Sequence, residues 1–203
     1  MTRRLRDAAP LLSFAACAAT RDLAAAARAV ARARTAGWPR GAAEETALML
    51  ILHAGFPAAL EAMSTLQRVW PGRARATIAR TPAGWRACGE RVCARVYGRS
   101  YPKLVANVRV LHPDLAGLMV EIGYGRVLSR PRLDGRTREL VAVAVLAALG
   151  WERQLVSHLL GATRFGATRS AALAAARIGA RAGGPAVAPA HAAAVATAFR
   201  GRW

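Results

Sequence analysis

Apolar and small residues recur at helical spacing along almost the whole chain, and Gly and Pro divide the pattern into segments. Apolar positions at i, i+3, i+4 and i+7 form one face of a helix, and no segment shows the strict alternation of a strand. We therefore predict an all-α protein with short connections, which favour antiparallel hairpins. The predicted helices cover residues 11–34 (ended by Gly37), 42–70 (broken at 54–57), 86–98, 101–111, 115–125, 136–149, 151–164 and 168–200 (broken at 183–189).

Two stretches rich in Pro, Gly and charge are predicted to be non-helical: a connector at 71–85 and a loop at 127–135. Asp114 is expected to cap the helix that follows it, because a side-chain oxygen there can accept a free backbone N–H. Glu44 and Glu45 are placed at the start of their helix, where carboxylates favour the helix dipole.

A weak internal repeat relates the two ends of the chain. When Gly37 is set against Gly166, the Ala-rich stretches before them follow the same rhythm. Ala29 then stands opposite His158, so the first copy lacks this polar group.

Composition allows one sizeable domain or two small packed units, since 54% of the 203 residues are hydrophobic. The net charge of +19 is typical of nucleic-acid binders. However, Lys103 is the single lysine among 30 basic residues, and the arginines are spread from Arg3 to Arg202. Codon preference in a GC-rich genome explains this pattern better, so we do not expect a nucleic-acid partner. The charge would still attract small anionic substrates.

The first twenty residues imitate a signal peptide, but their apolar part is short and Pro10 lies near its front. The longest uncharged stretches, such as 46–60, fall short of the ~20 apolar residues of a membrane span. We therefore expect a soluble, cytoplasmic protein without a membrane partner.

Three cysteines, Cys17, Cys88 and Cys93, are too few and too oddly spaced for a disulfide framework or a CxxC motif. We expect buried structural thiols. No cluster of Cys and His with metal-ligand spacing is visible, so we predict no metal site and no cofactor.

Glu139 and His158 are the polar pair that can carry chemistry. Gly150 is predicted to turn the chain between two helices, with Glu139 roughly 16 Å before the turn and His158 roughly 12 Å after it. On a hairpin the two side chains can then come within a few ångströms of each other. A carboxylate beside an imidazole orients it for acid–base catalysis. In the alternative interpretation, Glu139 only stabilises the start of its helix and His158 only packs in the core, so that neither has a catalytic role.

The stretch from "GYGRVLSRPRLDG" through "RTREL" and "QLVSH" to "GAT" (residues 123–168) resembles the carboxymuconolactone decarboxylase family, which includes the alkylhydroperoxidase D-like proteins. "LHAGFPAALEAM" (52–63) resembles a second stretch of the family, with His53 where tyrosine is usual. The resemblance implies an alkylhydroperoxidase D-like helical bundle made of two tandem repeats. We assign residues 1–71 to a degenerate N-terminal repeat, 72–98 to a connector and helix, and 99–203 to the C-terminal repeat.

The peroxidase members of this family carry a CxxC pair between their Glu and their His. On this chain the two cysteine positions fall on Trp151 and Gln154. Without a thiolate there, a hydroperoxidase activity is disfavoured.

Decarboxylase members lack the cysteines and keep the Glu and His, which implies a cofactor-free lyase acting on a small anionic lactone or carboxylate of aromatic catabolism. By this resemblance His158 would donate the proton and Glu139 would orient it. The residues assigned to substrate binding are Arg138, Arg130, Tyr124 and Gln154, with the arginines holding a carboxylate.

Some features depart from the decarboxylase pattern. The chain is longer than the simple enzyme, its first repeat lacks the acid–base pair, and Trp151 is bulky for a substrate site. A non-catalytic helical binding module therefore stays open as an alternative. By resemblance to the family's trimers and hexamers, we also expect a homo-oligomer, trimer-like in arrangement.

Overall fold

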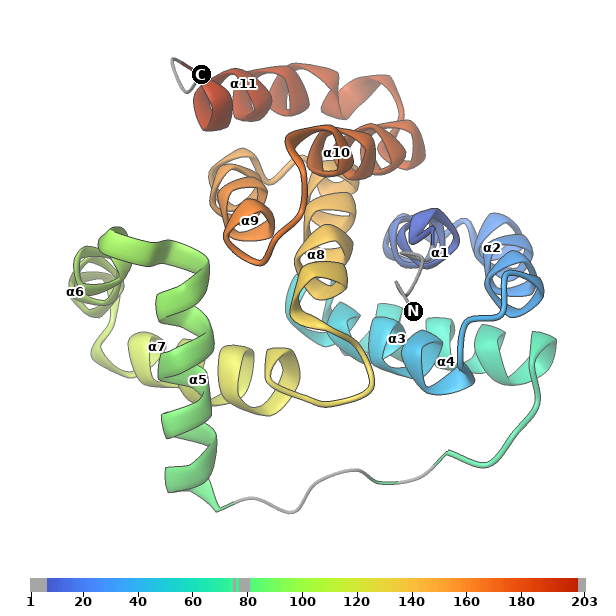
Figure 1. Ribbon diagram of the computed structural model, residues 1–203, viewed down its shortest axis with the longest axis horizontal. Coiled ribbons are helices and arrows are strands. Elements are labelled where there is room, and N and C mark those ends of the chain that lie inside the picture. The colour runs from blue at the N-terminus through green and yellow to red at the C-terminus, as the bar shows by residue number, and fades with distance from the viewer. Residues whose placement is uncertain (1–6, 75, 77–80, 201–203) are drawn as a thin grey trace, which may run out of the picture.

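The computed structural model describes residues 7–74, 76 and 81–200, and helices joined by short turns make up this part of the chain (Figure 1). No strand occurs in it, so the predicted all-α class is confirmed. The helices are α1 (Ala9–Ala19), α2 (Leu23–Thr35), α3 (Arg40–His53), α4 (Gly55–Val69), α5 (Pro82–Tyr97), η1 (Gly98–Ser100), α6 (Tyr101–Leu111), α7 (Pro113–Leu118), η2 (Met119–Leu128), α8 (Gly135–Leu149), α9 (Glu152–Arg164), α10 (Arg169–Gly183), η3 (Pro185–Val187) and α11 (Ala188–Phe199).

The single helix predicted at 11–34 is wrong, because the chain breaks there into α1 and α2. Arg21 adopts a left-handed backbone with φ of 67°, which ends the first helix. Asp22 then starts the second, since its side chain accepts the backbone N–H of Ala25 at 2.9 Å. An N-cap in the middle of an Ala-rich run was the signal for this break.

The region between α6 and α8 also differs from prediction. Asp114 does not cap the helix that follows; instead Nδ1 of His112 accepts the backbone N–H of Asp114 at 3.2 Å. The helix continues without a break from α7 into a π-helix, η2, which extends through Leu128 into the stretch predicted to be a loop. The wider turns of a π-helix are a frequent feature of functional sites.

Helix α8 forms the centre of the molecule, with α1, α3, α9 and α10 packed around it (Figure 1). Its residues from Thr137 to Ala148 are all buried. The buried apolar side chains of both halves of the chain form one continuous core around it. The two predicted repeats therefore pack as one unit rather than as separate domains.

Helix positions are consistent with the proposed repeat, which stays a prediction. Setting Gly37 against Gly166 makes α2 begin opposite α9, at residues 23 and 152, and α3 opposite α10, at residues 40 and 169. Gly37 follows α2 and Gly166 follows α9, and both have the positive φ with which helices commonly end.

Helices α5, α6 and α7 lie to one side of this bundle (Figure 1). Helix α5 packs against η2 and α9, and α3 reaches both α8 and η2. Elements from distant parts of the chain, namely α3, α5, η2 and α9, are thereby packed against one another in a continuous group beside α8. Within the described residues, no helix is long and apolar enough to cross a membrane.

Glycine at position 179 allows α10 to approach α8. A Cβ at Gly179 would collide with the backbone oxygen of Ala144 and lie 2.9 Å from Cβ of Ala147. We expect Gly179→Ala to lower the free energy of unfolding by about 1–3 kcal/mol, because overpacking forces the helices apart. Urea denaturation followed by circular dichroism measures this change.

Gly117→Ala is the matched control, since Gly117 lies in α7 and a Cβ there meets nothing within 4 Å. Because Ala favours a helix over Gly, we expect this variant to be unchanged or slightly more stable. Equal stability of the Gly179→Ala variant and the control would contradict close packing of α8 and α10.

Candidate functional site

The α8–α9 hairpin brings together the two residues that the sequence singled out. Gly150 turns the chain with φ of 73°, and Glu139 Oε2 then lies 2.9 Å from Nδ1 of His158. Both residues are buried, with 2% and 4% of their surfaces exposed. The predicted proximity is confirmed. When Glu139 is ionised, its carboxylate can only accept, so His158 donates from Nδ1 and keeps Nε2 for another partner.

Gly161 makes room for this pair. It follows His158 by three positions on α9, and a Cβ there would collide with Oε2 of Glu139 and lie 3.0 Å from Cγ1 of Val96. A glycine in a helix interior costs stability. Here the absence of a side chain leaves space for the buried carboxylate of Glu139 between α8, α9 and α5.

A second histidine, His53, lies against His158. The two rings meet edge to face, with their centroids 5.8 Å apart and their planes at 87°. Nε2 of His53 is buried without a hydrogen-bond partner, and burial together with the neighbouring His158 lowers the pKa of His53 to about 3. His53 is therefore neutral over the physiological range. It ends α3 in the N-terminal half, so both halves of the chain contribute to this cluster.

Weak acids surround Glu139 on the side of α5 and η2. Tyr124 donates from its hydroxyl to the hydroxyl of Tyr97 at 3.3 Å. Burial, with the negative charge of Glu139 as a smaller cause, raises the pKa of Tyr124 well above its usual range and that of Cys93 to about 12. These groups therefore stay protonated beside the carboxylate. The structure places Tyr124 near Glu139, as a donor of hydrogen bonds within the protein.

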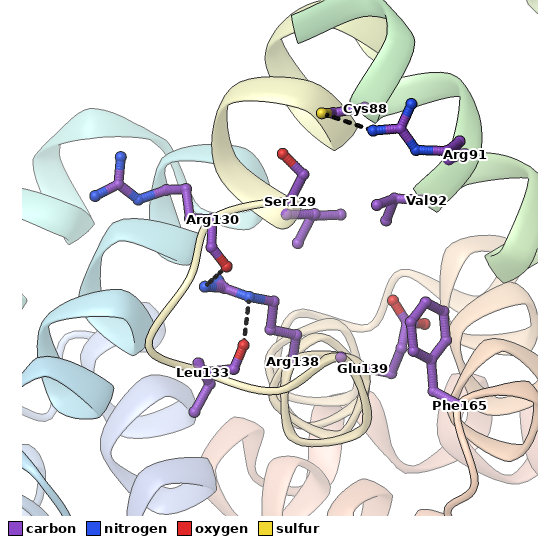
Figure 2. Close-up of a pocket in the computed structure, with 11 residues that line it drawn as sticks. Cys88, Arg91, Val92, Ser129, Arg130, Leu133, Arg138, Glu139 and Phe165 are labelled. Carbon is purple, nitrogen blue, oxygen red and sulfur yellow. Dashed lines mark hydrogen bonds between the residues drawn. The ribbon is translucent and has the colours of Figure 1, made fainter. Parts of the chain in front are cut away.

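A pocket of about 300 Å³ opens beside Glu139 (Figure 2). Glu139 is on its wall, whereas His158 is not among its lining residues. Of the pair, Glu139 therefore contributes to the pocket wall and His158 does not. The lining combines apolar, thiol, hydroxyl and basic groups with the one carboxylate of Glu139, and comes from α5, η2, the loop before α8, α8 itself and the end of α9: Cys88, Arg91, Val92, Leu128, Ser129, Arg130, Leu133, Gly135, Arg138, Glu139 and Phe165.

Arg138 and Arg130, both predicted to hold a substrate carboxylate, already bind a carboxylate of the protein. Nη2 of Arg138 lies 2.9 Å from Oε2 of Glu45, and Nε of Arg130 lies 3.0 Å from the same oxygen. Arg138 also donates to the backbone oxygens of Arg130, Pro131 and Leu133 at 2.7, 3.1 and 3.2 Å. It thereby fixes the loop that forms one wall of the pocket.

Arg138 nevertheless has donor capacity left. Its Nη1 atom is buried and has no hydrogen-bond partner within the described structure. Burial lowers the pKa of Arg138, and the ion pair with Glu45 opposes this shift. A guanidinium stays protonated at all ordinary pH values, so this buried group is a donor without an acceptor, on a residue that lines the pocket.

Glu45 was missed by sequence reasoning, which placed Glu44 and Glu45 at a helix start. Helix α3 in fact begins at Arg40, so both carboxylates lie on its second turn and are buried. Glu44 pairs with Arg40 and Arg132, as Glu45 does with Arg130 and Arg138. Two adjacent acids inside an otherwise apolar helix were the signal, because buried charges require partners.

Gln154 lies apart from this pocket. It is exposed on the first turn of α9 and is not among the lining residues, so its assignment to substrate binding stays a prediction without support from this geometry. Trp151 is also exposed and outside the lining, so its bulk does not fill the pocket. The positions from Trp151 to Gln154, just after Gly150, are exposed, and the buried face of α9 begins at Leu155 and includes His158.

The thiols differ from the expected buried structural set. Cys93 is buried, whereas Cys17 and Cys88 are only partly buried. In the described parts of the chain, no group of three or more His, Cys, Asp or Glu side chains could hold a metal ion.

Comparison with known proteins finds the same relationship that the sequence motifs indicated. Residues 113–198 match the carboxymuconolactone decarboxylase family, a range that includes Glu139, His158 and Arg138. A 63-residue segment is 38% identical to a 4-carboxymuconolactone decarboxylase of Acinetobacter baylyi. This segment covers 31% of the chain and spans about half, 47%, of that relative's length. The predicted family resemblance is thus confirmed in the C-terminal part of the chain.

His53 gives the site a measurable pH dependence. Below pH 6.5 the unfolded chain binds a proton at this histidine, whereas the folded protein does not until about pH 3. The free energy of unfolding therefore decreases as the pH falls through this window, by at most about 1.4 kcal/mol per pH unit from this group. We expect His53→Phe, which keeps a ring but cannot titrate, to lose less stability than wild type between pH 6.5 and 4.

Urea denaturation at several pH values compares the two proteins. The difference between their free energies of unfolding should change steadily below pH 6.5 and stay constant above it. A difference that is independent of pH would show that His53 is not held neutral by the fold.

Proposed function

We propose that this protein, whose C-terminal part matches the carboxymuconolactone decarboxylase family, is a lyase that removes carbon dioxide from a small anionic lactone or carboxylate. Glu139 and His158 carry the acid–base chemistry in this proposal. One observation carries it: a carboxylate on the wall of a pocket is hydrogen-bonded at 2.9 Å to an imidazole behind it. This arrangement can hold a proton next to a substrate while keeping it away from bulk water.

The reaction needs a proton at a defined carbon. Loss of carbon dioxide leaves an electron pair, which delocalises into the lactone and is then protonated. Because Glu139 lines the pocket, it is the group that delivers the proton to the substrate carbon. In the reacting state His158 is an imidazolium: its Nδ1 proton passes to Oε2 of Glu139 and from there to the substrate, which leaves a neutral ring and a carboxylate. This reverses the roles expected from the family resemblance, in which His158 donates directly.

Basic groups favour an anionic substrate in this pocket. Arg91 and Arg138 are both on the wall, and the buried Nη1 of Arg138 lacks an acceptor. A carboxylate oxygen placed against Nη1 would satisfy that donor with a charge-assisted hydrogen bond. Val92, Leu133 and Phe165 offer apolar surface for the rest of a small molecule.

The alternative of a non-catalytic binding module is less consistent with this geometry. If the protein were only a scaffold, Glu139 and His158 would not need to be in contact. The two groups could then lie well apart or be sealed from any pocket. Instead they are in direct contact, and Glu139 reaches the pocket wall. The relative from Acinetobacter baylyi is named as a 4-carboxymuconolactone decarboxylase, which makes that compound the first substrate to test.

Purified protein should turn over 4-carboxymuconolactone, and Glu139→Gln and His158→Ala should each lower kcat/KM by about 100-fold or more, as loss of a general acid does. Substrate consumption and carbon dioxide release measure this. Glu152→Gln is the matched control: Glu152 lies on α9 but is exposed, so activity should be retained. Full activity of the His158→Ala protein would falsify the mechanism.

A further inference from the structure

Cys88 lies on the wall of the same pocket as Glu139 (Figure 2). This position could not be expected from the sequence, because Cys88 belongs to α5 and lies far from the Glu139–His158 hairpin along the chain. The side chain is only partly buried. Small molecules that enter the pocket can therefore reach its sulfur.

Arg91 binds that sulfur directly. It follows Cys88 by three positions on α5, and its Nη2 lies 3.0 Å from Sγ. The nucleophile of a cysteine is its thiolate, for which a guanidinium hydrogen bond is a favourable contact. No ion pair to a carboxylate is found for Arg91 within the described residues, so its positive charge is available to a ligand.

A second group in the pocket independently indicates an anionic ligand. Arg138 is 3% exposed, lines the pocket, and has a buried Nη1 without a partner. Buried donors in proteins are nearly always satisfied, by the protein, by water or by a ligand. Glu139 is the one carboxylate on the described lining, and its Oε2 is bonded to His158.

We propose that Cys88 is a covalent attachment site for small carboxylate-bearing electrophiles. Arg138 and Arg91 hold the carboxylate, and the Cys88 thiolate forms a bond from Sγ to the electrophilic carbon. With a haloacid the carbon–halogen bond breaks and halide leaves. With an unsaturated acid the electron pair of the double bond moves to the neighbouring carbon, which takes up the proton that the thiol lost.

Such an adduct occupies the space in front of Glu139 and closes the pocket to other molecules. The inhibitory consequence rests on the proposed lyase function, whereas the reaction of Cys88 does not. The two can therefore fail separately: labelling is read from peptide masses, and lyase activity from substrate turnover.

Iodoacetate and iodoacetamide test the proposal, because they differ in charge but little in size. The folded full-length chain is treated with each reagent at low ionic strength, and modification of each cysteine is quantified by mass spectrometry. The rate ratio of iodoacetate to iodoacetamide at Cys88 should exceed that of N-acetylcysteine by about tenfold, and salt should reduce it. Cys17 should react more slowly than Cys88, since burial raises the pKa of the Cys17 thiol.

Arg91→Gln should lower the ratio at Cys88 towards that of the free thiol. Arg86→Gln should not, because Arg86 lies on the same helix but pairs with Glu90 and Glu121 outside the pocket. Cys93 is buried and should stay unlabelled in every variant, so its labelling reports unfolding. A ratio at Cys88 equal to that of N-acetylcysteine, or one that Arg91→Gln leaves unchanged in folded protein, would overturn the proposal.

Discussion

The hydrogen bond between Glu139 and His158 is the contact on which the rest of the site depends. Helix α8 is buried and largely apolar, and a carboxylate inside it is costly unless it has a partner. His158 supplies that partner from α9, and Gly161 leaves the space for it. The turn at Gly150 sets the register that brings the two helices face to face at this depth. A buried acid–base pair at the edge of a pocket is the result.

A second buried carboxylate, Glu45, supports the pocket wall through two of its arginines. It holds Arg138 and Arg130, and Arg138 in turn fixes the loop before α8 through three backbone oxygens. Removing one partner from such a buried network typically costs about 3–5 kcal/mol, because it leaves a charge unpaired. Glu45 and His53 both belong to α3, so the N-terminal half completes the site even though it has no acid–base pair of its own.

The hairpin and its polar pair were predictable from sequence because they depend on local periodicity and one glycine turn. Helix rise places Glu139 and His158 at similar distances from the turn, and so predicts that the two side chains can come close to each other. The pairing of Glu45 with Arg138 and the approach of His53 to His158 could not be predicted in this way, because they depend on how α3 packs across α8 and on residues about a hundred positions apart. The same holds for Cys88, which reaches the pocket only because α5 packs against η2 and α9. Gln154 was assigned from a family position alone, and its exposure depends on which face of α9 it occupies.

Nitrogen-15 NMR of the His158 ring tests the central claim most directly, because it reports which ring nitrogen carries the proton. A carboxylate at Glu139 requires the neutral ring to be protonated at Nδ1, with an N–H that exchanges slowly with water. His112 supplies an internal reference of the opposite kind, since its Nδ1 accepts the backbone N–H of Asp114. We predict a protected Nδ1–H on His158 at neutral pH. A ring protonated at Nε2 alone, or one whose protons exchange as freely as those of an exposed histidine, would contradict the account.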